Sequence, residues 1–99
     1  DNKNILVCVL DPKYLDQYYK IVNELRENGI NSEIYLDPAK NLKKQLTYAD
    51  KKGCSLALIC GQEEIEQDKI TIKKLKSKKE NDQISISSKN LINEIKKLI

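Results

Sequence analysis

The chain has 99 residues, of which 33% are charged, and a formal net charge of +3 at pH 7. Because this length supports only one hydrophobic core, we expect a single domain over residues 1–99. The chain begins with Asp and lacks Met, so we expect it to be excised from a longer protein or processed. No apolar run approaches the roughly 20 residues of a membrane span, and no signal-peptide pattern opens the chain, which predicts a cytoplasmic protein without membrane contact.

The first half of the chain alternates between strand and helix patterns. The first and last strand patterns are apolar on both faces, which is typical of strands covered on both sides of a sheet. The strand pattern between them alternates apolar and polar residues, as a strand near a sheet edge does. Short connections between these elements predict three parallel strands joined by right-handed crossovers. The strand patterns cover residues 4–10, 31–36 and 55–60, and the helix patterns cover residues 12–28 and 41–53.

The second half of the chain changes to alternating strands and one last helix. Residues 69–75 and 82–87 each place isoleucines at every second position, and the polar segment between them predicts a hairpin. A final amphipathic helix follows, with Ser87 or Ser88 as its expected cap. The predicted fold is therefore a three-layer α/β/α domain with a five-stranded mixed sheet, in which three parallel strands precede an antiparallel pair, and with three main helices.

Residue types exclude several catalytic and metal-binding chemistries. Cys8, Cys54 and Cys60 lack metal-ligand spacing, and the chain has no His to complete a zinc site or a Cys–His pair. The cysteines are interpreted as small buried residues in a reducing compartment. Glu63 and Glu64 are adjacent, so on a helix they point about 100° apart and do not form an acid–base pair. We therefore expect no catalytic residue, no metal ligand and no cofactor in this domain.

In open α/β sheets, ligands bind at the carboxyl ends of the parallel strands, and we term this edge of the predicted sheet the rim. If the fourth strand runs antiparallel beside the third, its first residue reaches the same edge. The rim then contains hydrogen-bonding side chains of both positive and negative charge, which suit the recognition of the polar edges of a ligand better than catalysis. Its expected members are Asp11, Lys13, Asp37, Lys40, Asn41, Gln62, Glu63, Glu64 and Lys69.

The charges of the chain are arranged in segments. Lysines are concentrated in residues 40–52 and 69–79, and carboxylates lie between them in residues 63–68. Two basic segments around an acidic one suit a surface that binds phosphate with some selectivity, whereas a solvated face of a lysine-rich protein is the alternative. The lysines at the end of the second basic segment are interpreted as a solvated loop: Lys74, Lys76, Lys78 and Lys79.

One ordered combination of motifs resembles a known family. The basic segment "KKQLTYADKKG" precedes the buried strand "LALIC", the turn "GQEE" and the strand "KITIKKL". This order, from Lys43 to Leu75, is similar to that of the C-terminal anticodon-binding domain of class IIa aminoacyl-tRNA synthetases, with histidyl-type members the most similar. The elements before and after it also follow the family's order, so the resemblance covers nearly the whole chain.

The resemblance implies that the domain binds the anticodon stem-loop of a tRNA. In the family, contacts come from the loop entering the second helix, the start of that helix, the glutamate turn and the following strand. Glu64 and Asn41 are expected to bind base edges, because unpaired anticodon bases expose edges that carboxylates and amides recognise. The lysines of the set are expected to bind phosphates, and the groups are expected to converge on the rim. The implied tRNA-binding residues are Asp37, Lys40, Asn41, Lys44, Gln45, Gln62, Glu64, Lys69, Thr71 and Lys73.

The resemblance also implies partners outside the domain. The domain itself is non-catalytic, while a separate catalytic domain of the same chain, using ATP and Mg, attaches histidine to its tRNA, and the parent enzyme is expected to be a homodimer. Prolyl-, threonyl- and glycyl-type synthetases share this domain and remain alternatives. Another alternative is a synthetase-like protein-interaction domain that regulates other enzymes without binding tRNA. Tyr48 fits either stacking on a nucleotide or docking on the catalytic domain.

Overall fold

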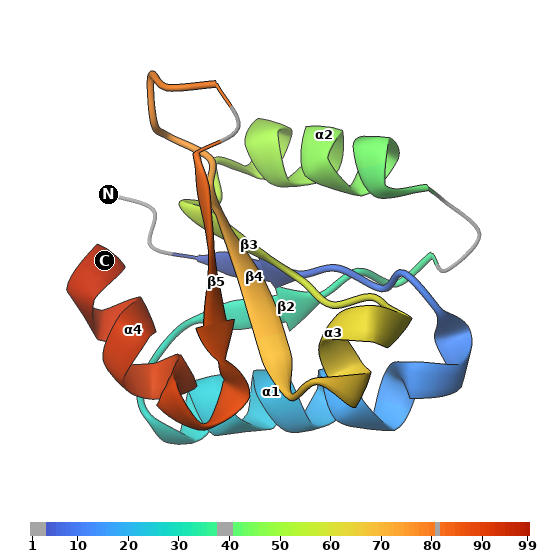
Figure 1. The fold of residues 1–99 in the computed structure, drawn as a ribbon. Coiled ribbons are helices and arrows are strands. Elements are labelled where there is room, and N and C mark those ends of the chain that lie inside the picture. The colour runs from blue at the N-terminus through green and yellow to red at the C-terminus, as the bar shows by residue number, and fades with distance from the viewer. Residues whose placement is uncertain (1–3, 38–40, 81) are drawn as a thin grey trace.

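The computed structural model describes residues 4–37, 41–80 and 82–99, and it contains one five-stranded sheet with helices on both faces (Figure 1). The strands are β1 (Ile5–Val7), β2 (Ser32–Ile34), β3 (Leu56–Ile59), β4 (Lys69–Lys74) and β5 (Gln83–Ser87). The α-helices are α1 (Leu15–Glu27), α2 (Leu42–Lys52), α3 (Gln62–Glu66) and α4 (Leu91–Leu98), and the 3-10 turns η1 (Pro12–Tyr14) and η2 (Ser88–Asn90) precede α1 and α4. This arrangement confirms the predicted three-layer α/β/α fold with three main helices, to which the structure adds the short helix α3.

The sheet has the strand order β2-β1-β3-β4-β5. β1 pairs in parallel with β2 and with β3, so Leu6 lies between Glu33 and Ala57. β4 runs antiparallel to β3, which brings Thr71 opposite Ile59, and β5 runs antiparallel to β4. The predicted parallel unit and the predicted antiparallel pair are therefore both confirmed, and β4 begins beside the carboxyl end of β3.

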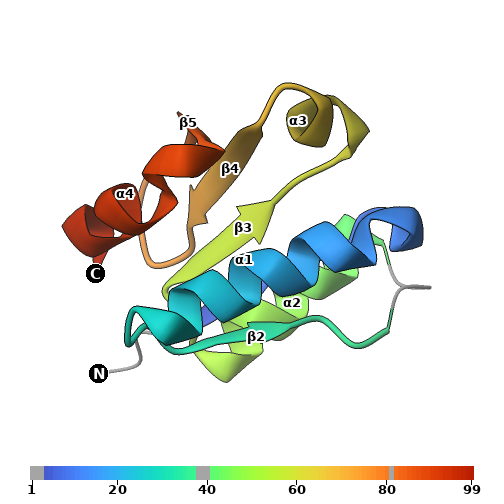
Figure 2. The same cartoon turned by 90° about the horizontal axis from the view of Figure 1, so that it is seen from below.

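Two hydrophobic cores lie on the two faces of the sheet. On one face, α1 and α4 pack through residues that include Tyr18, Val22 and Leu91, and Figure 2 views the molecule from this side. On the other face, a smaller core contains Ala49 of α2 and Leu6 of β1. Because both faces of the sheet are covered at β1 and β3, these strands are buried along their whole length.

The face of β4 and β5 that lies on the α2 side of the sheet is open. Ile70 and Ile72 of β4 belong to the larger core, so Lys69, Thr71 and Lys73 lie on the opposite side of the strand. Among the described residues, no member of β4 or β5 itself belongs to the smaller core. The β4–β5 hairpin therefore stands beside α2 rather than beneath it (Figure 1).

Local contacts determine where the helices begin and end. The side chain of Asn41 accepts a 2.9 Å hydrogen bond from the backbone N–H of Lys44 and caps α2. Gly53 ends this helix with a φ of 75°, which glycine adopts at low cost. The predicted cap of the last helix by Ser87 or Ser88 is wrong, because the chain first makes the turn η2, and neither η2 nor α4 begins with a side-chain cap bond.

An arginine of α1 binds the outer side of the edge strand β2. The carbonyl of Asn31 accepts a 3.1 Å hydrogen bond from the N–H of Ile5, so the next carbonyl along the strand, that of Ser32, points away from β1. Arg26 donates to this carbonyl through Nε at 3.2 Å and through Nη2 at 2.9 Å. The guanidinium of α1 thereby occupies an acceptor at the edge of the sheet.

Candidate nucleic-acid interface

The rim is built from three chain segments, of which the first two follow β1 and β2. Oδ1 of Asp11 accepts a 3.1 Å hydrogen bond from the backbone N–H of Lys13 and so begins the turn η1. Asp37 is exposed after β2, and Asn41 is exposed at the N-terminus of α2. The predicted contact at Lys40 lies outside the described residues. The two aspartates thus lie at the carboxyl ends of neighbouring parallel strands, where the topology predicts them.

The third segment of the rim is α3, which directly follows β3. Oε1 of Glu64 accepts a 2.8 Å hydrogen bond from the N–H of Gly61, and a Cβ at position 61 would lie 3.2 Å from that oxygen. Gln62 is exposed, and its Nε2 donates to Oε1 of Glu66 at 3.0 Å. Among the described residues, neither the second carboxylate oxygen of Glu64 nor the amide oxygen of Gln62 is hydrogen-bonded. Helix α3 therefore keeps two acceptors available at the rim.

Gln45 is a buried structural residue, and the prediction that it contacts tRNA directly is wrong for this geometry. Its side chain lies fully buried between α2 and the sheet. Its Oε1 accepts a 2.8 Å hydrogen bond from the N–H of Val9, and its Nε2 donates a 2.7 Å hydrogen bond to the carbonyl of Val9. These two bonds take the place of strand pairing at Val9, and β1 ends at Val7 although the predicted strand runs to residue 10.

β4 carries three of the predicted tRNA-binding residues at every second position. Lys69 is exposed at the first position of the strand, beside the rim, and Thr71 pairs with the last residue of β3, Ile59. Lys73 pairs with Ala57, farther from the rim, and four residues of extended strand separate it from Lys69 by about 13 Å. The prediction that all these groups converge on one edge is therefore wrong for Lys73.

Lys73 instead lines a groove of about 460 Å³ between α2 and the β4–β5 hairpin, which we term the α2–hairpin groove. One wall is the flank of α2 that carries Lys43, Thr47 and Lys51, and the other wall is the end of β4 with the hairpin loop. The predicted phosphate contact Lys44 is exposed on α2 but does not line this groove. The sequence interpretation missed this wall, although the four-residue spacing of its members places them on one flank of a helix.

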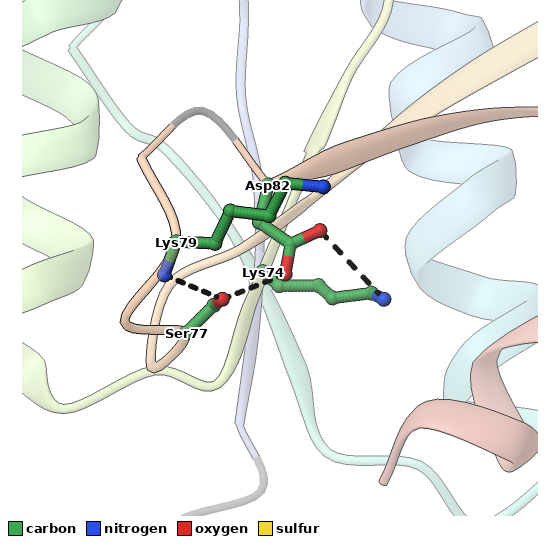
Figure 3. Close-up of polar contacts among 4 residues, drawn as sticks. All are labelled: Lys74, Ser77, Lys79 and Asp82. Atoms are coloured by element: carbon green, nitrogen blue, oxygen red, sulfur yellow. Dashed lines mark hydrogen bonds and ion pairs between the residues drawn. The ribbon is translucent and has the colours of Figure 1, made fainter.

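A polar network orders the hairpin wall of the groove (Figure 3). The hydroxyl of Ser77 donates to Oδ2 of Asp82 at 2.6 Å and accepts from the backbone N–H of Lys79 at 3.1 Å. Nζ of Lys74 lies 3.8 Å from Oδ1 of the same carboxylate. The Ser77 hydrogen bond, followed by the charges of Lys74 and Lys79, holds the pKa of Asp82 below its usual value. The interpretation as a solvated loop is therefore wrong for Lys74, which belongs to β4 and pairs with Asp82, whereas Lys79 is exposed in the loop.

Tyr48 lies on the other flank of α2, toward β2. Its ring meets that of Tyr35 edge-on, with the ring centroids 5.3 Å apart, and Nζ of Lys52 lies 5.8 Å from its centroid. The ring is half-buried against the smaller core. Burial and the nearby carboxylate of Glu33 raise the pKa of the Tyr48 phenol. These contacts engage the ring within the domain, away from the α2–hairpin groove.

The three thiols of the chain are buried in the two cores. Cys8, Cys54 and Cys60 are free and buried, and burial raises the pKa of Cys8 and of Cys60 to about 12. Within the residues that the structure describes, no group of three or more His, Cys, Asp or Glu side chains is placed to hold a metal ion. None of the helices described is both long and apolar enough to span a membrane.

Comparison with known proteins identifies relatives over the whole chain. A family model described as "Anticodon binding domain" matches residues 4–98. The histidine–tRNA ligase of Pelagibacter ubique is 54% identical over 100 residues, which cover all of this chain and 22% of that protein. The histidine–tRNA ligase of Mesorhizobium japonicum is 45% identical over 71 residues, which cover 72% of this chain and 14% of that protein. The chain thus spans about a fifth or less of the length of these relatives.

Solved structures give the same result for the fold. The histidyl-tRNA synthetase from Nostoc sp. PCC 7120 is 27% identical and superposes with a TM-score of 0.88, covering 97% of this chain and 22% of that one. The RNA binding domain of threonyl-tRNA synthetase from Cryptosporidium parvum superposes with a TM-score of 0.81 over 98% of this chain and 23% of that one. At 15% identity, this second likeness shows a shared fold only.

Proposed function

Because this chain belongs to the family of anticodon-binding domains, we propose that it is the anticodon-binding domain of a histidine–tRNA ligase and that its rim binds the anticodon loop of histidine tRNA. The observation that carries the proposal is the 54% identity to the Pelagibacter ubique ligase over the entire chain. In the proposed parent enzyme, a separate catalytic domain attaches histidine to the tRNA with ATP and Mg, and this domain is non-catalytic. The parent is a cytoplasmic homodimer that does not contact membranes.

Base recognition is assigned to Asn41 and Glu64. The Oδ1 of Asn41 caps α2, which leaves its amide NH₂ group as a donor toward a base. The Oε1 of Glu64 caps α3, which leaves Oε2 as an acceptor for the amino group of a base. In both cases a backbone bond holds one side-chain atom, so the second atom is pre-oriented and loses little rotamer freedom on binding.

The remaining rim residues are assigned to phosphates and to weaker polar contacts. Lys44 and Lys69 are exposed beside the proposed base-reading residues, and their ammonium groups suit phosphate oxygens. Lys40 is assigned the same role from the sequence alone. Asp37, Gln62 and Thr71 supply further hydrogen-bonding groups, and Lys73 is assigned to the groove described above rather than to the rim.

The test is a titration of the domain with labelled anticodon stem-loops that carry histidine, proline or threonine anticodons, followed by fluorescence anisotropy at low and moderate salt. We expect the histidine stem-loop to bind most tightly. Glu64→Gln keeps the hydrogen bond from the Gly61 N–H but removes the charge. In this variant we expect the preference for the histidine stem-loop over the other two to fall about tenfold, because one good base contact contributes about that factor. Glu27→Gln removes one exposed carboxylate on α1 and is the matched control.

Two results would count against this function. Equal and strongly salt-dependent binding of all three stem-loops would leave a basic surface that does not read the anticodon. No binding at low salt by a domain that circular dichroism shows to be folded would favour a protein-interaction domain instead.

A further inference from the structure

We infer that the α2–hairpin groove binds the phosphate backbone of paired RNA, namely the stem that continues from the anticodon loop, independently of its sequence. The inference rests on the proposed function, since it needs an RNA whose loop lies at the rim. The groove lies outside the residues that the family resemblance assigns, apart from Lys73.

The charge of the groove suits a polyanion. Its walls carry five lysines and two aspartates, so its excess of three positive charges equals the net charge of the whole chain. One aspartate, Asp82, is already bonded to Ser77 and paired with Lys74. Among the described residues, the side chains of Lys43 and Lys51 have no ion-pair partner. The electrostatic potential of the groove is therefore positive, and the ammonium groups of these two lysines can bind phosphates and so release the counterions of an RNA.

The chemistry of the walls favours backbone contacts over base contacts. None of the described residues that line the groove is aromatic or an arginine, so an unpaired base would find no ring or guanidinium on which to stack. The two hydroxyl groups of the walls are engaged internally. Thr47 donates to the carbonyl of Lys43 at 2.9 Å, and Ser77 donates to Asp82 at 2.6 Å. Lysine ammonium groups are what remains, and these neutralise phosphates without reading sequence.

The groove is continuous with the rim along both of its walls. On α2, Lys43 lies in the first helical turn after the rim residue Asn41, and Lys51 lies about 12 Å farther along the helix at 1.5 Å per residue. On β4, Lys73 follows Thr71 on the same face of the strand. An RNA whose loop contacts the rim can thus extend its stem along the groove, and the stem is covalently joined to that loop.

The experiment compares two double variants with equal charge change. Lys43→Gln with Lys51→Gln alters the groove, and Lys89→Gln with Lys96→Gln alters η2 and α4, across the sheet from it. Glutamine keeps the helix propensity of lysine. Each protein is titrated with the histidine stem-loop, with the threonine stem-loop and with a loop-only oligonucleotide, at 50 and 200 mM salt.

For the groove variant with the stem-loop, we expect the slope of log K against log salt to be shallower by about 1.8, since each lost contact to paired phosphates contributes about 0.9. Its affinity deficit is then about tenfold larger at 50 mM than at 200 mM salt. Binding of the loop-only oligonucleotide, and the preference for the histidine anticodon over the threonine one, should stay unchanged. Asp50→Asn, which removes a groove carboxylate, should tighten stem-loop binding.

The outcomes separate this inference from the proposed function. If the groove variant binds the stem-loop like wild type while the anticodon preference persists, the inference is overturned and the groove serves another acidic partner, such as a protein. If the groove variant loses anticodon preference, the groove reads bases and sequence independence is wrong. If wild type shows no anticodon preference at all, it is the proposed function that fails.

Discussion

The hydroxyl of Tyr18 on α1 donates a 2.6 Å hydrogen bond to the carbonyl of Cys60, the residue between β3 and the rim glycine Gly61. Both residues are buried, so this bond joins the larger core directly to the segment that positions α3. We predict that Tyr18→Phe lowers the free energy of unfolding by about 1–2 kcal/mol, because it leaves a buried carbonyl without a donor. Urea denaturation followed by circular dichroism measures the difference. Tyr19→Phe, at a half-exposed neighbour, is the control and should change stability by less than about 0.5 kcal/mol.

The two hydrogen bonds between the side chain of Gln45 and the backbone of Val9 lead to a second prediction about stability. Gln45→Ala should cost about 2–4 kcal/mol in urea denaturation, since it leaves a cavity and two unpaired backbone groups. Gln45→Glu keeps the acceptor for the N–H of Val9, but only a protonated carboxyl can donate to the Val9 carbonyl.

The stability of Gln45→Glu should therefore depend on pH. The folded state raises the pKa of the introduced carboxyl, so the variant is most stable below about pH 4.3 and loses stability as pH rises through the raised value. If the free energy of unfolding differs between this variant and wild type by the same amount at every pH, the side chain at position 45 does not donate to the Val9 carbonyl as described.

Asn41 is expected to combine a structural and a recognition role, and two substitutions separate them. Asn41→Ala removes the cap from α2 and should cost about 1 kcal/mol of stability. Asn41→Asp keeps an oxygen for the N–H of Lys44 but loses the amide donor, so stability should be retained while affinity for the histidine stem-loop falls. Urea denaturation and anisotropy titration on the same samples give both values. Wild-type affinity in Asn41→Asp would remove this residue from the base-reading set.

The Ser77–Asp82 bond predicts how the hairpin responds to acid. Because the pKa of Asp82 is lowered in the folded state, the bond's contribution to stability is present above the ordinary value of 3.8 and is lost as pH falls through the lower folded value. NMR shifts of the Lys79 amide, which donates to Ser77, should titrate with a midpoint below 3.8. Ser77→Ala should raise the Asp82 midpoint more than Lys74→Gln does, and the reverse order would show that charge dominates.

The buried thiols should resist alkylation in the folded protein. A thiol with a pKa of about 12 is ionised in about one molecule in ten thousand at pH 8, and Cys8 and Cys60 are also inaccessible. Mass spectrometry after iodoacetamide treatment should find both unmodified in the native protein and modified in guanidinium chloride. Modification of either residue at equal rates in the two conditions would show that the larger or the smaller core opens readily.

The fold could be predicted from the sequence because its periodicities are strong and its connections are short. Helix α3 was not predicted from the sequence. It has only five residues, and its segment "QEEIE" has too few apolar positions to show a helical period. β1 was predicted too long for a different reason. Its apolar run continues to residue 10, but the backbone of Val9 bonds to a side chain from α2, and pairing of that kind leaves no local signal in the strand.

The positions of site residues could be predicted where the sheet topology alone determines them, as at the carboxyl ends of the parallel strands. They could not be predicted where they depend on packing between segments that are distant in the sequence. Gln45 is polar, and its sequence neighbours Lys43 and Lys44 are exposed, so nothing local distinguishes a buried amide from a solvated one. The groove depends on how the β4–β5 hairpin stands beside α2, a relation between segments that are about 30 residues apart.

The hydrogen bonds from Arg26 of α1 to β2 have a consequence for the behaviour of the domain at high concentration. A strand at the edge of a sheet offers its outward carbonyls to the backbone of any extended chain, including a second copy, and this is the usual start of edge-to-edge aggregation. At this edge, Arg26 already occupies the outward carbonyl of Ser32 with two N–H groups. An incoming strand has to displace the guanidinium first, so β2 is a poor template for intermolecular β-pairing.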